Sequence, residues 1–176
     1  MVEEKFGEWN VGELLGKDVR GSVYRATSSQ AGQPPCLLYH FTSLSTFLAG
    51  FSDRLTEYVR QAQKWNHPNL VRVLDGGVSE GRAYLVTEGV WSTNLENSLR
   101  AGNKPEWIQV LLIAMNLVSA LRYLHRRGVI HRDIRPCRIL VDPATREVRI
   151  SHAGLEELFA TETLTLNENP LDRAAF

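Results

Sequence analysis

The stretch that decides the fold reads His131-Arg132-Asp133-Ile134-Arg135-Pro136-Cys137-Arg138-Ile139-Leu140-Val141-Asp142, and Val148-Arg149-Ile150-Ser151-His152-Ala153-Gly154-Leu155 follows it closely. A charged segment runs directly into the apolar triplet 139–141, and a second apolar segment returns at 148–150. Between the two, Asp142-Pro143-Ala144-Thr145 has the residue types of a tight turn. The pattern predicts a small hairpin with a charged loop before it and a glycine-containing turn after it.

These two segments resemble the catalytic loop and the metal-binding loop of protein kinases. In that family the first contains His-Arg-Asp-Leu-Lys-Pro-x-Asn, whose Asp is the base and whose Asn binds magnesium, and the second contains Asp-Phe-Gly, whose Asp binds magnesium. Here Asp133 stands at the position of the base, Arg138 replaces the Asn, and His152-Ala153-Gly154 replaces Asp-Phe-Gly. The resemblance implies a kinase frame in which both metal ligands are missing, so no metal site is expected.

Residues 9–16 and 21–26 are predicted strands that resemble the two sides of the kinase glycine-rich loop. Gly16 and Gly21 match its first and third glycines, and Val23 follows them. Glycine is needed there because backbone N–H groups must approach phosphate closely. Asp18 occupies the second glycine position, where a carboxylate would repel phosphate. Taken alone, the segment could equally be an ordinary hairpin whose glycines serve the turn.

The apolar segment 36–41 resembles the strand that carries the nucleotide-binding lysine. Alignment on its last apolar residue places Tyr39 at the lysine, and a shift of one residue places His40 or Leu38 there. No register supplies a lysine. In the favoured register Leu37 replaces the small alanine that contacts adenine, which would narrow the pocket.

Apolar residues at helical spacing predict a helix that resembles the regulatory helix of the small lobe; they are Phe51, Leu55, Tyr58, Val59, Ala62 and Trp65. The family spacing from His67 puts Tyr58 where the lysine-pairing glutamate should be. Glu57 is the neighbouring residue and points about 100° away around the helix. We therefore expect a Tyr39–Tyr58 contact in place of the usual ion pair.

Two further strands are predicted at 70–75 and 83–88, joined by a turn that contains Gly76-Gly77. The resemblance makes Thr87 the gatekeeper and Glu88-Gly89-Val90 the hinge. It also places Leu140 in the nucleotide-binding set with Gly16, Gly21, Val23 and Leu37.

The helical lobe is predicted to start at 91–99, and a long helix is predicted from Pro105 to Arg127 with Gly128 as its C-cap. Polar residues interrupt its apolar run, which favours an amphipathic core helix over a membrane span. In kinases this helix packs on the central helix of the large lobe, which we do not expect in this chain. Six residues should then form an exposed patch for a protein partner or a second copy: Trp107, Leu111, Ala114, Leu117, Val118 and Leu121.

Composition is that of a soluble globular chain: 176 residues, 43% hydrophobic, 23% charged, and 20 basic residues against 20 acidic ones. This balance gives no electrostatic reason to expect a nucleic-acid or membrane partner. Cys36 and Cys137 are isolated in segments that look buried, which favours free thiols in a reducing compartment. The acidic N-terminus does not look like a targeting leader. We expect a cytoplasmic protein.

The sequence thus predicts an α+β, protein-kinase-like fold. Residues 1–90 would form the N-lobe with an antiparallel sheet, one regulatory helix and the hinge; 91–155 would start a truncated helical C-lobe; and 156–176 would be a flexible, activation-segment-like tail.

The missing ligands predict a catalytically inactive domain that acts as a binding or regulatory module without a cofactor. Alternatives are an ATP sensor that uses Arg138 in place of magnesium, an atypical Ser/Thr kinase that recruits Glu156 or Glu157, and a fragment with no independent role. Thr161, Thr163 and Thr165 could accept phosphate and pair with Arg132.

Overall fold

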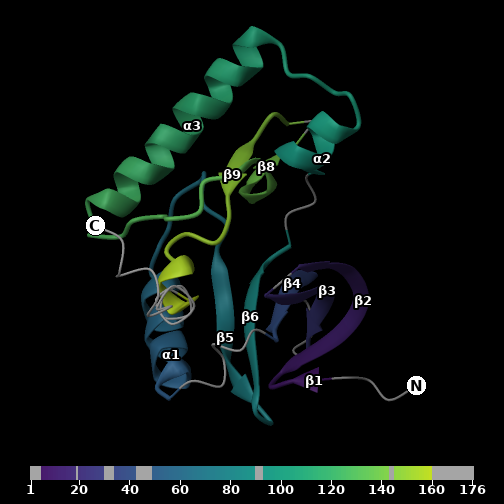
Figure 1. The fold of residues 1–176 in the computed structure, drawn as a ribbon, viewed down its shortest axis with the longest axis vertical. Coiled ribbons are helices and arrows are strands. Elements are labelled where there is room, and N and C mark those ends of the chain that lie inside the picture. The colour runs from purple at the N-terminus through teal and green to yellow at the C-terminus, as the bar shows by residue number, and fades with distance from the viewer. Residues whose placement is uncertain are drawn as a thin grey trace, which may run out of the picture.

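The computed structural model describes residues 5–18, 20–29, 34–42, 49–89, 93–142 and 145–159. Its N-terminal part is a sheet with one helix beside it, and its C-terminal part is a small sheet with two helices (Figure 1). The elements in chain order are β1 (Lys5–Phe6), β2 (Trp9–Asp18), β3 (Gly21–Ser28), β4 (Cys36–Phe41), α1 (Phe51–Ala62), β5 (Val73–Ser79), β6 (Arg82–Glu88), β7 (Thr93–Asn94), α2 (Leu95–Arg100), α3 (Trp107–His125), the 3₁₀ turn η2 (Pro136–Arg138), β8 (Ile139–Val141) and β9 (Val148–Ile150).

The larger sheet has the strand order β1-β2-β3-β4-β6-β5, and every neighbouring pair is antiparallel. Side chains alternate between its two faces, as the twofold period of a strand requires. In β4, Cys36 and Leu38 join a core cluster with Phe6 and Trp9, whereas Phe41 joins the cluster under α1. The predicted antiparallel N-lobe sheet is confirmed.

The strand predicted at 70–75 is displaced, because β5 begins at Val73 and runs through Gly76 and Gly77. The predicted glycine turn is therefore wrong; the chain turns at 80–81 instead. A Cβ on Gly76 would lie 2.8 Å from Cγ2 of Val59. Glycine at this position allows α1 to lie against the strand, so it serves packing and not a turn.

Helix α1 buries one face, formed by Phe51, Leu55, Val59 and Ala62. This is the apolar stripe that the sequence predicts, although Trp65 lies beyond the end of the helix. The stripe packs on the sheet through Phe41, Ala83 and Leu85 and on a later segment through Leu155, Leu158 and Phe159.

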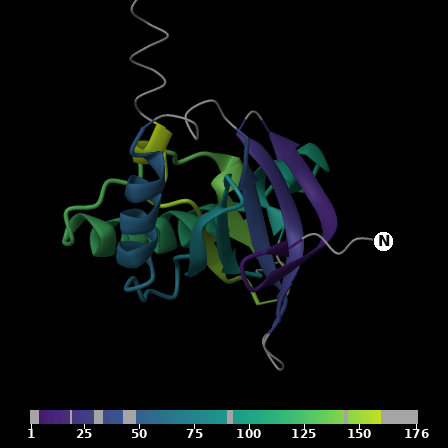
Figure 2. The same ribbon diagram turned by 90° about the horizontal axis from the view of Figure 1, so that it is seen from below.

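That later segment corrects the prediction of a flexible tail. Residues 156–159 form a helical turn, and Leu158 and Phe159 are buried in the core cluster beside α1 (Figure 2). Leu158 and Phe159 cover part of the apolar face of α1 that the sheet does not cover. The remainder, 160–176, lies outside the described residues, as do Thr161, Thr163 and Thr165.

The C-terminal part contains the predicted hairpin, since β8 and β9 pair in antiparallel fashion and β7 adds a third strand. Asn69 joins this part to the N-terminal one. Its side chain donates to Oδ1 of Asn116 at 2.8 Å and to the carbonyl of Val148 at 2.8 Å. The amide of Ile150 donates to the Asn69 carbonyl at 2.9 Å. These bonds fix the hairpin relative to the large sheet.

Helix α3 begins after Pro105 with a capping box between Glu106 and Gln109. Only Ile113, Ala120 and Leu124 are buried. Of the six residues predicted to form an exposed patch, Trp107, Leu111, Ala114 and Val118 are exposed and Leu117 and Leu121 are half-buried. Most of the helix surface is exposed, and by length and composition alone the helix could also cross a membrane.

Candidate functional site

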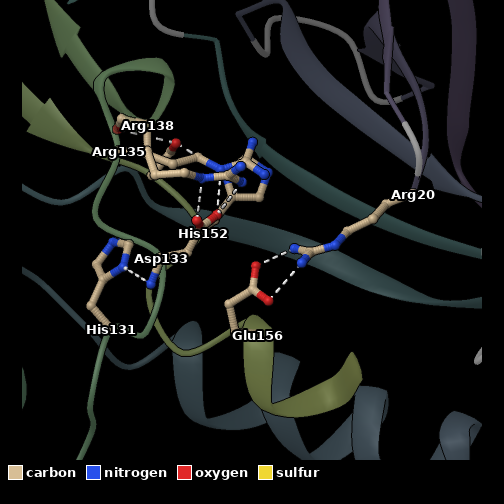
Figure 3. Close-up of polar contacts among 8 residues, drawn as sticks. Arg20, His131, Asp133, Arg135, Arg138, His152 and Glu156 are labelled. Carbon is tan, nitrogen blue, oxygen red and sulfur yellow. Dashed lines mark hydrogen bonds and ion pairs between the residues drawn. The ribbon is translucent and has the colours of Figure 1, made fainter. Parts of the chain in front are cut away.

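The loop before η2 is anchored by His131, which is 1% exposed. Its Nδ1 accepts a hydrogen bond from the amide of Asp133 at 3.3 Å, and Gly154 donates from its amide to the His131 carbonyl at 3.3 Å. The two predicted loops are thereby held side by side. Figure 3 shows Asp133, Arg135, Arg138 and His152 gathered at one place on these loops.

Asp133 is only 7% exposed, and two arginines bind its carboxylate. Nε of Arg135 lies 2.5 Å from Oδ1, and Nε of Arg138 lies 2.8 Å from Oδ2. Arg135 also donates from Nη2 to Oδ2 at 2.9 Å. Burial raises the pKa of Asp133, but hydrogen bonds and positive charge from the two arginines outweigh it and hold the pKa well below its usual range.

This arrangement opposes base catalysis at Asp133. A general base must accept a proton from a hydroxyl within hydrogen-bond reach, and its pKa should lie near the working pH. Both carboxylate oxygens of Asp133 already accept bonds from arginine, and the lowered pKa makes the group a weak base. In this geometry Asp133 is a structural anchor of the loop.

His152, at the position of the metal-binding Asp, has a left-handed backbone with φ of 65°. Burial, reinforced by the charge of Arg138, lowers its pKa well below the usual value. The lowered pKa favours the neutral form of the ring at pH 7. Its Nδ1 lies 2.9 Å from Oγ of Ser151, and its ring meets Tyr39 edge-on at 4.6 Å between centroids.

Tyr39, which the resemblance aligns with the nucleotide-binding lysine, lies on β4 and contacts the ring of His152. Tyr58 lies behind it on α1 and donates from its hydroxyl to the Ala153 carbonyl at 3.1 Å. Burial raises the pKa of Tyr58, and the nearby Tyr39 phenol adds to the shift. Both tyrosines pack against the same core cluster, and their ring contacts are Tyr39 with His152 and Tyr58 with Trp65.

Gly21 is required by packing between strands. A Cβ there would lie 1.9 Å from the carbonyl oxygen of His40 on β4. Gly16, by contrast, has open space at its Cβ position. Asp18 pairs with Gly21 across the hairpin, although its side chain lies outside the described residues. Packing of β3 against β4 therefore requires glycine at position 21, whereas no contact requires it at position 16.

Arg20 links this hairpin to the C-terminal segment. Its guanidinium forms a two-pronged ion pair with Glu156, in which Nη2 lies 2.6 Å from Oε2, and it also lies 5.0 Å from the centre of the Phe159 ring. The space between the hairpin, Tyr39, Arg138 and His152 measures about 20 Å³. That is room for about one water molecule and far less than a small-molecule site.

The structure brings together some of the other residues that the resemblance assigns to nucleotide binding. Leu37 on β4 and Thr87 on β6 are paired, and Thr87 is 4% exposed. Glu88 accepts from Nη1 of Arg149 at 2.8 Å, which ties the predicted hinge to β9. Leu140 is half-buried in β8, Val23 is half-buried in β3, and Val90 lies outside the described residues.

Sequence reasoning missed Arg20, Arg135 and Phe159. The spacing of Arg135 from Asp133 in the sequence does not reveal an ion pair. Glu156 and Glu157 were weighed as metal ligands, but they are bound by Arg20 and, at 3.7 Å, by Arg132.

Comparison with known proteins agrees with this geometry. Residues 9–169 match the family described as "Protein kinase domain". The chain is 30% identical over 159 residues to cell division control protein 2 homolog 3 of Trypanosoma brucei brucei. The aligned region covers 90% of this chain and 50% of that protein. It is 30% identical over 174 residues to the serine/threonine-protein kinase PknJ of Mycobacterium tuberculosis, covering 97% and 29%.

Among solved structures, the kinase domain of Mycobacterium tuberculosis PknI superimposes with a TM-score of 0.77 at 20% identity, covering 88% of this chain and 62% of that one. Rad53 in complex with AMP-PNP superimposes with a TM-score of 0.73 at 23% identity, covering 84% and 38%. The chain therefore spans half or less of the two curated relatives and under two thirds of the solved chains. Together with the loop geometry, these matches show that the chain belongs to the protein kinase family and has its fold.

Proposed function

We propose that this kinase-like domain is catalytically inactive, a pseudokinase that acts by binding. The observation that supports the proposal most directly is the double ion pair on Asp133. The residue at the base position is engaged by Arg138, and Arg138 itself stands where the family has its magnesium-binding Asn. One substitution thus removes a metal ligand and occupies the base.

The residues present do not fit magnesium. Magnesium requires hard oxygen ligands in an octahedral arrangement. Arg138 offers only N–H donors and a permanent positive charge, and His152 offers a buried ring nitrogen. Loss of a single electrostatic stabiliser typically costs about 10²–10³ in rate. With Tyr39 also in place of lysine, turnover should be negligible even if the effects are not additive.

Two alternatives receive less support. A metal-free ATP sensor would need the Arg138 guanidinium for phosphate, but Asp133 holds it, and only about 20 Å³ is open beside it. An atypical kinase would need a replacement carboxylate, but Glu156 and Glu157 are engaged by arginines on other segments.

Calorimetric titration with ATP, with and without magnesium, tests the proposal. We expect no heat of binding in either condition. Metal-independent binding that is lost in Arg138→Ala would favour the sensor. Binding that requires magnesium, together with phosphate transfer to a peptide, would show that the proposal is wrong.

We propose the exposed patch of α3 as the surface that binds a protein partner or a second copy. Trp107 is 77% exposed and Val118 is 63% exposed, which is costly for an isolated soluble helix. Light scattering at micromolar concentration should show a dimer that Val118→Glu converts to monomer. If the wild-type chain is a monomer, the proposed dimer is wrong.

In keeping with its free thiols and neutral charge, we propose a cytoplasmic protein without nucleic-acid or membrane partners.

A further inference from the structure

A second cavity lies on the C-terminal part, between α2, the start of α3 and the hairpin β8–β9. Its volume is about 310 Å³, many times that of the space beside Arg138 and His152. Small-molecule sites in proteins usually begin at about 300 Å³. The cavity shares no lining residue with the one at the kinase site.

The floor of the cavity is apolar and well supported. Ile113 and Val148 belong to a buried cluster against which Leu95 and Val141 pack. Ile113 comes from α3 and Val148 from β9, so two elements that are fixed by other contacts define the floor. A preformed apolar floor can bind an apolar group without a large ordering cost.

The rim of the cavity carries two cations, Lys104 before α3 and Arg146 in the hairpin turn. Within the part of the chain that the structure describes, neither side chain forms an ion pair. The one acidic residue in the lining, Asp142, accepts a hydrogen bond at Oδ1 from the amide of Thr145 at 3.1 Å. The carboxylate of Asp142 keeps its negative charge, so the two cations leave the rim with a net single positive charge above an apolar floor.

We propose that this cavity binds a small amphipathic carboxylate, with an aromatic or branched aliphatic body. The body would lie on Ile113 and Val148, and the carboxylate would be held at the rim by Lys104 and Arg146. Charge-assisted hydrogen bonds to a carboxylate are stronger than neutral ones, so the site discriminates against a neutral molecule of the same shape. The inference does not depend on whether the kinase site is active.

The probe pair is 1-naphthylacetate and the neutral 2-(1-naphthyl)ethanol, titrated calorimetrically into the full chain at low salt. We expect saturable binding, with the acid preferred by about fivefold, because exposed ion pairs contribute about 1 kcal/mol. The double variant Lys104→Gln/Arg146→Gln should abolish the preference and leave binding of the alcohol unchanged. Arg126→Gln, at the other end of α3, is the control and should keep the preference.

A second variant tests the position of the body. Ser98, on the α2 wall, is half-buried, and Ser98→Phe should fill the cavity and weaken both probes at least about tenfold. Circular dichroism checks that each variant is folded. Equal affinity for the two probes, a preference that survives in the double variant, or no saturable binding up to about 5 mM would overturn the proposal.

Discussion

The guanidinium of Arg138 and the carboxylate of Asp133 form an ion pair in which Nε lies 2.8 Å from Oδ2, and both side chains are largely buried, at 12% and 7% exposure. Asp133 stands at the base position and Arg138 at a metal-ligand position of the family. Under the function proposed above, this one pair accounts both for the missing metal ligand and for the engaged base, and it also stabilises the loop.

Removing one partner of this pair should destabilise the domain. In Arg138→Ala, Asp133 keeps only Arg135, whose side chain is 53% exposed. A buried carboxylate left with fewer partners typically costs about 1–3 kcal/mol. Urea unfolding measures the change. Arg100→Ala breaks the exposed pair with Glu96 and should cost less than about 0.5 kcal/mol. Equal losses in the two variants would show that the Asp133 pair adds no special stability.

Stability should fall as the solution is acidified, in two steps. The folded pKa of His152 is lowered well below its usual value, and those of His131 and His67 are also lowered, so the unfolded chain binds more protons below about pH 6.5. That step should reduce the free energy of unfolding by up to about 1.4 kcal/mol per pH unit. Asp133 also has a lowered pKa, so its contribution is present above about pH 3.9 and is lost as pH falls toward its folded value.

The His152 step can be isolated by substitution. His152→Gln removes the titrating ring, so the slope of stability between pH 6.5 and 5 should become shallower than in the wild type. Urea unfolding at half-unit pH intervals measures both slopes. Identical slopes would mean that His152 does not titrate differently in the folded and unfolded chains.

The N-lobe sheet, α1 and the hairpin β8–β9 could be predicted because their signals are local. The apolar run at 36–41, the helical spacing from Phe51 to Ala62, and the turn residues after Val141 are each local signals. Gly76 was misassigned because a glycine pair in isolation indicates a turn. Its true role depends on Val59, which lies on another element.

The candidate site was less predictable, because its contacts, like that of Gly76, depend on residues outside the local segment. The sequence identifies which family positions are substituted, but not that Arg135 and Arg138 both turn onto Asp133 or that Arg20 reaches Glu156. Those contacts join segments far apart in the chain or depend on the loop conformation that His131 fixes. The burial of Leu158 and Phe159 likewise depends on α1.

The two loop glycines should differ sharply in their tolerance of a side chain. Gly21→Ala places a Cβ 1.9 Å from the His40 carbonyl oxygen, so β3 and β4 must shift apart. We expect a loss of about 2 kcal/mol or more in the free energy of unfolding. Gly16→Ala meets open space and should change stability by less than about 1 kcal/mol. Similar values for both would mean that the strand contact is not what requires Gly21.

Restoring the family residues should restore magnesium-dependent ATP binding only when Tyr39, Arg138 and His152 are all changed. Tyr39→Lys supplies the phosphate-binding cation, and Arg138→Asn with His152→Asp supplies oxygen ligands and leaves Asp133 with Arg135 alone. We expect the triple variant to bind ATP in a magnesium-dependent way, measured by calorimetry. Tyr39→Lys alone is the control; it leaves Arg138 on Asp133 and should give no heat. Magnesium-dependent binding by this single variant would show that the Arg138 pair does not block the site.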